Sequence, residues 1–459
     1  MMRAREGSTR SPVRILIPLI LAVALVSRVA IVVAGGQFYW PDEDRYRQSR
    51  ALVGVLEHGE AKPVASLDHF LFKSIGRVPA AVESAYLEDA RIPAAFFALF
   101  SVVNIFLLAG IARRLGGDAV ESGLVALLFA ASTSFLYFTR HLLPYDVAMT
   151  FGLLAVRAAV MPDTSWRVSL VCGAWASLCF LTYFGYWTFG GAACVIHVLQ
   201  KADWRSVIRR SAATAVGLAT PVVLFVGASD SGRMVVADSM SFMADVDQGA
   251  FAEGWRVPFE YLWHAEHGLL LLWIASVIVC LVSWRRSFDL PVVRVGLLGV
   301  LFVYGTLAVF STGFEAFVVY GRLARQLVPF FCLVTAAVLA RLAPRTQMRQ
   351  AFLWIVGVAI VIQAGFNARP IFAQQFPSEF ISRGEQVARM HGASRTVLLY
   401  TEHLYPPRSL EVPAGMVEIF AAPHPLQFLP YQYEGYTPQE RQFLRSTDIR
   451  MRVLIPVLP

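Results

Sequence analysis

Long apolar runs alternate with short polar or charged segments along most of this chain, as far as about residue 366. A helix of about 20 apolar residues crosses the hydrocarbon core of a bilayer. The pattern therefore predicts an all-α polytopic membrane protein with about 11 transmembrane helices. We expect these helices at 15–34, 92–111, 120–137, directly after Asp146, and at 168–182, 187–199, 212–227, 267–283, 295–310, 326–342 and 351–366.

Three polar segments stand out between and after these runs. Residues 35–91 contain nine acids and seven bases, with helices expected at 43–58 and 80–89, and residues 229–265 contain six acids and two arginines. The tail, 367–459, is polar and rich in proline, with a helix expected at 378–391 and short strands at 396–400 and 453–456. We therefore predict a transmembrane module, 1–366, and a small α/β C-terminal domain, 367–459.

The distribution of basic residues predicts the orientation of the helices. If successive apolar runs cross the membrane in alternating directions, the segments on the same side as residues 1–14 hold 18 Lys and Arg against five acids. The two long loops on the opposite side are net acidic. Basic residues are enriched in short cytoplasmic loops. We therefore expect a multi-pass protein of the cytoplasmic (inner) membrane, with a cytoplasmic N-terminus and an extracytoplasmic C-terminal domain.

Composition agrees with this class. Hydrophobic residues make up 56% of the 459 residues and charged residues only 16%, against about 25% charged in soluble domains. The net charge of +8 is spread between the apolar runs, so we predict no nucleic-acid partner. The five cysteines fall inside apolar runs and indicate neither a disulfide framework nor a zinc knuckle.

The first candidate site is acidic and follows the first apolar run. Asp42, Glu43 and Asp44 come after Phe38-Tyr-Trp-Pro41, and aromatic residues favour the membrane–water boundary. Carboxylates held there could act as bases, bind cations or position hydroxyl groups. The alternative is a solvated acidic loop.

Two groups of basic residues are also candidates. Arg322 and Arg325, beside Tyr320, are spaced so that a helix would place them on one face, where two guanidiniums suit a phosphate. The alternative for them is snorkelling at the interface. Arg140 and His141 could join them, or they could simply cap a turn.

The segment Trp263-His-Ala-Glu-His267 offers nitrogen and oxygen ligands. His264 and His267, with Glu266 between them, could bind a divalent metal ion, and Asp42 or Glu83 could complete the ligand set. Two histidines and one acid fall short of a full set. The alternative is a group of polar interfacial residues at the start of a helix, so no cofactor is certain.

The order of these motifs resembles the GT-C superfamily of lipid-dependent glycosyltransferases, in the branch of the protein O-mannosyltransferases and the lipid A aminoarabinose transferases. The resemblance covers about 15–160 well and 315–345 weakly. Pro-Asp-Glu opens the first outer loop, a proline pair usual in that loop is replaced by Asp68-His-Phe-Leu-Phe72, and Tyr145 splits a usual proline–aspartate pair. The other matching segments are Arg91-Ile-Pro-Ala, Arg113-Arg114, Arg140-His-Leu-Leu-Pro-Tyr-Asp146 and Tyr320-Gly-Arg-Leu-Ala-Arg-Gln-Leu-Val-Pro329.

The resemblance implies an inverting glycosyltransferase of the cell envelope. Such an enzyme moves a sugar from a polyprenyl-phosphate donor to a hydroxyl of a glycan, lipid or protein at the outer membrane face. It favours Asp42 as the base, with Glu43 orienting substrate, and it places Asp146 with Arg140, His141, Tyr320, Arg322 and Arg325 among the substrate-binding residues.

Two other functions remain open. A surface-polysaccharide ligase or polymerase would use arginine and histidine of a large outer loop, and Arg233, Arg256 and His264 of 229–265 fit that description. A flippase of polyprenyl-linked saccharides would show charged or broken helices near the middle of the bilayer and an internal repeat. The apolar runs show neither clearly.

Overall fold

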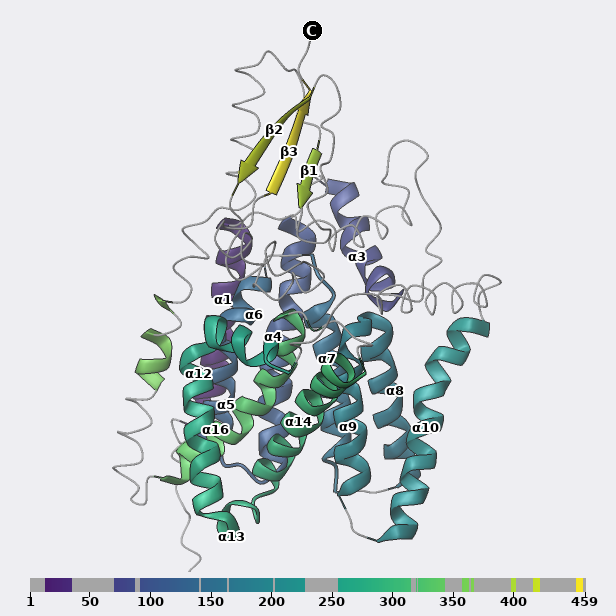
Figure 1. Cartoon of the computed structure of the whole chain (residues 1–459), viewed down its shortest axis with the longest axis vertical. Helices are drawn as coiled ribbons and strands as arrows, with labels where there is room; N and C mark the ends of the chain where they lie inside the picture. The colour runs from purple at the N-terminus through teal and green to yellow at the C-terminus, as the bar shows by residue number, and fades with distance from the viewer. Residues whose placement is uncertain are drawn as a thin grey trace, which may run out of the picture.

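The computed structural model describes residues 13–34, 70–86, 91–139, 142–162, 165–200, 203–227, 255–314, 319, 321–342, 357–362, 365–366, 398–401, 416–421 and 451–456. Within these ranges the protein is a bundle of helices together with a small antiparallel sheet (Figure 1).

The helices follow the apolar runs closely. In chain order they are α1 (Val13–Ala34), α3 (Phe70–Tyr86), α4 (Arg91–Arg114), α5 (Ala119–Ala130), α6 (Thr133–Phe138), α7 (Tyr145–Ala159), α8 (Trp166–Thr182), α9 (Trp187–Leu199), α10 (Trp204–Gly227), α12 (Val257–Val282), α13 (Trp284–Ser287), α14 (Pro291–Ala308), α15 (Gly321–Ala324) and α16 (Val328–Leu342). Short 3-10 turns, η1 (Phe184–Tyr186) and η3 (Arg325–Leu327), precede α9 and α16, and the π-helical turn η2 (Val309–Gly313) extends α14.

Several of these helices have the length and apolarity of membrane spans. Five windows qualify among the described residues: Leu16–Val33, Ile92–Arg114, Trp204–Phe225, Ala265–Val282 and Pro291–Gly313. Large aliphatic side chains such as Val26, Val223 and Leu301 point outward from them and are more than 60% exposed, as expected where lipid rather than water surrounds the bundle. The chain is a multi-pass membrane protein. The count of 11 spans stays a prediction.

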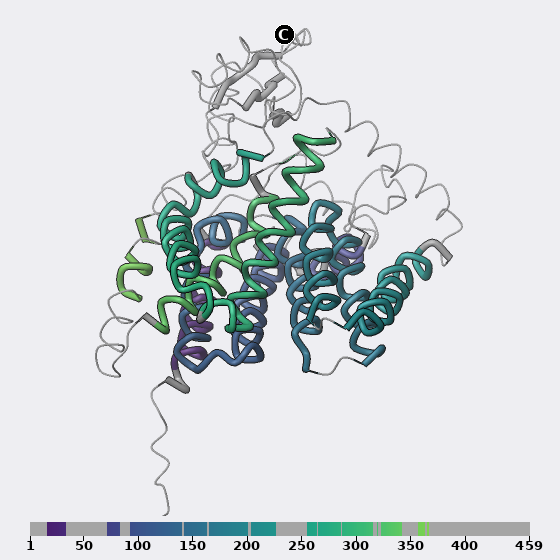
Figure 2. Tube along the Cα trace, turned by 60° about the horizontal axis from the view of Figure 1, so that its bottom comes forward, coloured from purple at the N-terminus to yellow at the C-terminus, as the bar shows by residue number. Residues whose placement is uncertain are grey.

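Close packing of α8 against α10 depends on two glycines. A Cβ atom on Gly173 would lie 2.2 Å from the carbonyl oxygen of Thr214, and one on Gly217 would lie 2.2 Å from that of Leu170. Only glycine permits this backbone approach. The contact holds α10 at one edge of the bundle, on the side away from α1 (Figures 1 and 2).

Some expected helices are interrupted, which corrects the sequence-based boundaries. The third run, expected as one helix over 120–137, breaks after Ala130 and resumes at Thr133. The helix expected from 267 begins at Val257 and is kinked at Glu266, whose φ of −133° is not helical. The helix expected at 80–89 is wrong at its start, because α3 begins at Phe70. The one expected at 43–58 lies outside the described residues.

The interior of the bundle also holds ionisable side chains. Arg28, Arg210, Arg325, Asp146 and Glu266 are all buried. The apolar runs of the sequence did not show a broken helix or buried charges clearly, but the structure contains both. The cause is that single charged residues and a Ser-Thr-Ser segment scarcely lower the hydropathy of a 20-residue window.

The C-terminal part of the chain forms a three-stranded antiparallel sheet. Strand β3 (Met451–Pro456) lies between β1 (Leu398–Thr401) and β2 (Met416–Ala421), with Leu399 opposite Val453 and Ile419 opposite the same residue on the other edge. Strands were expected at 396–400 and 453–456, where β1 and β3 are found. The expected helix at 378–391 lies outside the described residues, so the α/β domain and its boundary stay predictions.

Candidate active site

Asp146 lies in the first turn of α7, directly after the turn that ends in Pro144. A carboxylate is favourable there because the first amide groups of a helix carry partial positive charge. The backbone carbonyl of Asp146 accepts hydrogen bonds from Asn104 Nδ2 and from Thr150 Oγ1, each at 2.9 Å. Asn104 belongs to α4, so these bonds tie the start of α7 to its neighbour.

Arg325 reaches Asp146 from a distant part of the chain. Its Nη2 atom donates to Asp146 Oδ1 at 2.8 Å, across 179 residues of sequence. The Arg325 side chain is fully buried and that of Asp146 is 9% exposed. Removing one partner of such a buried pair costs about 3–5 kcal/mol, because the other charge is then left uncompensated.

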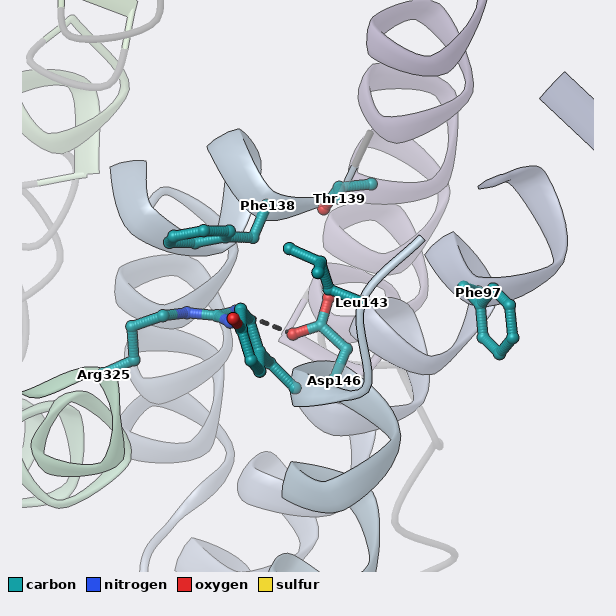
Figure 3. Close-up of a pocket in the computed structure, with 7 residues that line it drawn as sticks. Phe97, Phe138, Thr139, Leu143, Asp146 and Arg325 are labelled. Carbon is teal, nitrogen blue, oxygen red and sulfur yellow. Dashed lines mark hydrogen bonds and ion pairs between the residues drawn. The ribbon is translucent and has the colours of Figure 1, made fainter. Parts of the chain in front are cut away.

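Aromatic rings surround the guanidinium of Arg325. Its central carbon lies 4.2 Å from the ring centroid of Phe135, 4.8 Å from that of Phe138 and 5.6 Å from that of Tyr145. These distances allow cation–π attraction, which strengthens when the cation is removed from water. Figure 3 shows the guanidinium reaching Asp146 beneath Phe138. The rings therefore cover the guanidinium of the ion pair, and two of them, Phe135 and Phe138, belong to α6.

Gln326 fixes the turn that carries Arg325. Its Oε1 atom accepts from Thr188 Oγ1 at 2.7 Å and from the Phe189 amide at 3.0 Å, while its Nε2 atom donates to the Gly185 carbonyl at 3.0 Å. All three bonds are buried and lead to η1 and the start of α9. A fully satisfied buried amide has one preferred orientation, so Gln326 determines where the adjacent Arg325 side chain points.

Not all donors at this site are used. Arg325 Nε and Nη1, together with the Tyr186 and Tyr261 hydroxyls, are buried without a hydrogen-bond partner among the described residues. Both phenols interact electrostatically with Arg325. Beside the pair lies a small pocket (Figure 3), lined by Phe97, Phe138, Thr139, Leu143, Tyr145, Asp146 and Arg325. A guanidinium with free N–H groups beside a pocket suits an anionic oxygen such as that of a phosphate.

Solved structures resemble this bundle. ArnT from Cupriavidus metallidurans bound to undecaprenyl phosphate matches with a TM-score of 0.54 and 19% identity, over 77% of this chain and 65% of that one. Its apo form matches with the same TM-score, 18% identity and coverages of 77% and 64%. The apo oligosaccharyltransferase of Archaeoglobus fulgidus gives a TM-score of 0.49 at 11% identity, over 80% and 57%. No family model and no curated protein matches the sequence.

The bundle has the GT-C fold. The similar structures are GT-C glycosyltransferases, as the sequence motifs indicated. At these identities the likeness concerns the fold. This chain also spans only about two thirds of the length of the ArnT structure, 65% in the match.

Within the GT-C fold, two of the predicted site residues come together. Asp146 and Arg325 were expected among substrate-binding residues, and the structure pairs them directly. Arg325 does not snorkel to an interface, because its side chain is fully buried. The other predicted residues of this site lie outside the described residues, or their side chains do: Asp42, Glu43, Arg140, His141, Tyr320 and Arg322.

The metal hypothesis concerns the segment around Glu266. Within the part of the chain that the structure describes, no group of three His, Cys, Asp or Glu side chains is placed to hold a metal ion. The Glu266 carboxylate is turned toward α6, where Ser132, Thr133 and Ser134 donate to it. His267 is half-buried, and the side chain of His264 is not among those described. A site at His264 and His267 stays a prediction, without Glu266 as an evident ligand.

Sequence reasoning missed Gln326, Asn104 and the phenylalanines of α6. Gln326 directly follows a candidate arginine inside an apolar region, and an amide there needs several partners. That signal could have marked it. The phenylalanines carry no such signal, since an aromatic residue in a membrane helix is ordinary.

Proposed function

We propose that this chain is an inverting glycosyltransferase that uses a polyprenyl-phosphate-linked sugar as donor and a hydroxyl group of a glycan, lipid or protein as acceptor. The observation that carries the proposal is the buried Arg325–Asp146 pair inside a GT-C fold, in which two N–H groups of Arg325 have no hydrogen-bond partner within the part of the chain that the structure describes. An undecaprenyl phosphate is bound by the ArnT structure that this fold resembles. Here the phosphate of the donor would lie against Arg325.

Asp146 would set the strength of this phosphate site. By holding one edge of the guanidinium it fixes the orientation of the remaining N–H groups and offsets part of the positive charge. A partly neutralised site binds the phosphate of the donor, and it binds the polyprenyl phosphate product weakly enough for that product to leave. Arg322, Tyr320, Arg140 and His141 are the further candidates for contacts to the phosphate or the sugar.

The transfer needs one base and one displacement. The acceptor hydroxyl gives its proton to the carboxylate of Asp42 while its oxygen attacks the anomeric carbon. The bond from that carbon to the phosphate oxygen breaks, and polyprenyl phosphate departs with the electron pair. Attack opposite the leaving group inverts the configuration. Glu43 would orient the acceptor or the loop that carries Asp42.

The reaction would take place at the outer face of the inner membrane. The charge pattern of the loops supports this side, and so does the chemistry, because the prenyl tail keeps the donor phosphate at the membrane surface. The N-terminus would be cytoplasmic and the C-terminal domain extracytoplasmic. This orientation places Asp42, in the first outer loop, on the same side as the start of α7.

The Asp42→Asn variant tests the base. General-base assistance supplies about 10²–10⁴-fold in rate, so this variant should fail to consume the donor in cells. We expect mass spectrometry to show polyprenyl-phosphate sugars accumulating both in a deletion strain and in that strain carrying Asp42→Asn, but not with the wild-type gene. Glu43→Gln should give partial accumulation.

A flippase is the second candidate, since the structure does contain a broken helix and buried charges. Its loss would also cause donor to accumulate. Purified protein in liposomes, supplied with the accumulated donor and with an envelope extract that provides the acceptor, separates the two. A transferase moves the sugar to the acceptor hydroxyl and releases polyprenyl phosphate, whereas a flippase leaves the sugar–phosphate bond intact. Normal release by Asp42→Asn would move the base elsewhere and favour the ligase-type site in 229–265.

A further inference from the structure

The break between α5 and α6 directly precedes the helix whose Phe135 and Phe138 rings lie against Arg325. α5 ends at Ala130, and α6 begins at Thr133 after Ser132, which has extended backbone angles and provides no side-chain cap of its own. Each end of a helix leaves backbone groups without a partner in the helix. In a membrane protein such groups need partners from elsewhere in the structure.

Glu266 supplies acceptors for the start of α6. Its Oε2 atom accepts from the Thr133 amide at 3.2 Å, and its Oε1 atom accepts from the Ser134 amide at 2.9 Å and the Ser134 hydroxyl at 2.7 Å. The Ser132 hydroxyl donates to Oε1 as well. Glu266 is 4% exposed and occupies the kink of α12. The Glu266 carboxylate thus connects the kink of α12 to the break before α6, because it accepts four hydrogen bonds from residues 132–134.

Arg28 supplies donors for the end of α5. Its Nη2 atom donates to the Ala130 carbonyl at 3.2 Å, its Nη1 atom to Ala24 O at 3.3 Å, and its Nε atom to Ser101 Oγ at 2.9 Å. Arg28 is 1% exposed and lies in the C-terminal half of the apolar helix α1. It therefore joins α1, α4 and the last carbonyl of α5, and the negative charge of Asp146 also acts on it.

We propose that Arg28 and Glu266 are positioning residues that hold the two ends of the broken helix, so that α6 stays above Arg325. We call Arg28 and Glu266 together the clamp. The link from the clamp to the donor phosphate rests on the proposed function. α6 carries Phe135 and Phe138, which cover the guanidinium, and it is followed directly by Thr139 of the pocket. Neither Arg28 nor Glu266 touches substrate in this account.

The directions of the hydrogen bonds distinguish this positioning role from simple balancing of buried charge. The groups facing Glu266 include two amide N–H groups, which only donate, and the backbone groups facing Arg28 are carbonyls, which only accept. Exchanging the two side chains conserves the total charge but sets donor against donor and acceptor against acceptor. The exchanged pair should therefore keep the wild-type position of α6 only if the balance of buried charge is all that matters.

The position of α6 can be followed by labelling a cysteine at Thr139, in a protein whose five native cysteines are replaced by alanine. Thr139 is 2% exposed, so the wild-type clamp should keep the thiol slow to react with a small methanethiosulfonate. Charge-assisted hydrogen bonds are lost in Glu266→Gln and Arg28→Gln, and we expect the labelling rate to rise by about tenfold or more in each.

Matched controls lie elsewhere in the bundle. Glu121 is a buried glutamate at the other end of α5, and Arg210 is a buried arginine of α10 that donates to the His197 carbonyl. Glu121→Gln and Arg210→Gln should leave labelling at position 139 unchanged. If Glu266→Gln or Arg28→Gln does not fold, the milder Glu266→Asp and Arg28→Lys replace them, with a smaller rise expected.

The outcomes are separable from those of the proposed function. Labelling at wild-type rate in the folded Arg28 and Glu266 variants would overturn the clamp, as would wild-type labelling in the exchanged pair Arg28→Glu/Glu266→Arg. The same variants, tested by native mass spectrometry with undecaprenyl phosphate, should bind it about tenfold more weakly. Raised labelling with unchanged lipid binding would support the clamp and contradict the phosphate site at Arg325.

Discussion

At the scale of single residues, the buried Arg325–Asp146 pair can be understood from its surroundings. Two charges removed from water roughly break even unless further contacts compensate them. Here the rings of Phe135 and Phe138 lie against the guanidinium, and Gln326 holds the turn. The Arg325 Nε and Nη1 groups have no hydrogen-bond partner among the described residues, and stability does not explain them. We therefore propose that they bind a ligand.

Substitutions of this pair should separate stability from binding. Arg325→Gln leaves the Asp146 charge buried, so we expect a lower thermal midpoint in detergent and about tenfold or weaker binding of undecaprenyl phosphate. Adding Asp146→Asn removes the uncompensated charge and should recover part of the midpoint without recovering the binding. Scanning fluorimetry and native mass spectrometry measure the two quantities.

Arg341→Gln is the control for this prediction, since Arg341 is a partly exposed arginine that pairs with Glu121 at 3.4 Å at the end of α16. It should leave the binding of undecaprenyl phosphate unchanged, although it lowers the thermal midpoint, because the buried carboxylate of Glu121 loses this partner. If the double variant of Arg325 and Asp146 bound undecaprenyl phosphate as well as the wild type does, the pair would be a structural element only.

The pairing itself could not be predicted from the sequence. Asp146 and Arg325 were each recognisable as polar residues at the ends of apolar runs, but they are 179 residues apart and no local pattern joins them. Glu266 was interpreted as a companion of two histidines because they are neighbours in sequence. Its true partners, Ser132 to Ser134, lie on another helix.

At the scale of elements, hydropathy predicted most helices because the membrane core requires long apolar segments. α1, α4, α8 and α9 lie where they were expected. The break between α5 and α6 was missed because serine and threonine are tolerated in apolar helices, and only partners from α1 and α12 make the break stable. Helices that begin early, such as α12, start in polar sequence whose helicity depends on packing.

The contact between α8 and α10 gives a test at this scale. Gly173→Ala and Gly217→Ala place a methyl group 2.2 Å from a backbone oxygen, so the helices must separate, and we expect about 1–3 kcal/mol of lost stability. Gly110→Ala on α4 meets nothing within 4 Å and should leave the thermal midpoint unchanged or raise it slightly. Equal midpoints for all three variants would mean that α10 is not packed this closely.

At the scale of the whole molecule, the order of motifs predicted the fold better than any one motif did. The sequence motifs follow one another in the order expected of the GT-C superfamily: acids after the first span, Arg91 at the start of α4, and a polar turn before α7. All three are expected on one side of the membrane. That order depends on topology, which the GT-C fold preserves at 19% identity to ArnT. Sugar and acceptor were not predictable, because their recognition depends on side-chain geometry.

The orientation of the chain can be measured directly. Ser409→Cys, in a background without native cysteines, should react with a membrane-impermeant maleimide in intact spheroplasts, since the charge pattern predicts that 367–459 lies outside. Ser206→Cys, in the first turn of α10, serves as the opposite control and should react only after lysis. The reverse pattern would require a different number of spans.

The most direct test of the account is a cryo-electron microscopy structure of the full chain in lipid nanodiscs with undecaprenyl phosphate. We expect phosphate density beside Arg325 and Asp146, under Phe138, with the carboxylate of Asp42 facing the position of the departing sugar. Density for the phosphate against residues 229–265 instead, or none at this site at saturating lipid, would contradict the central claim that Arg325 holds the donor phosphate.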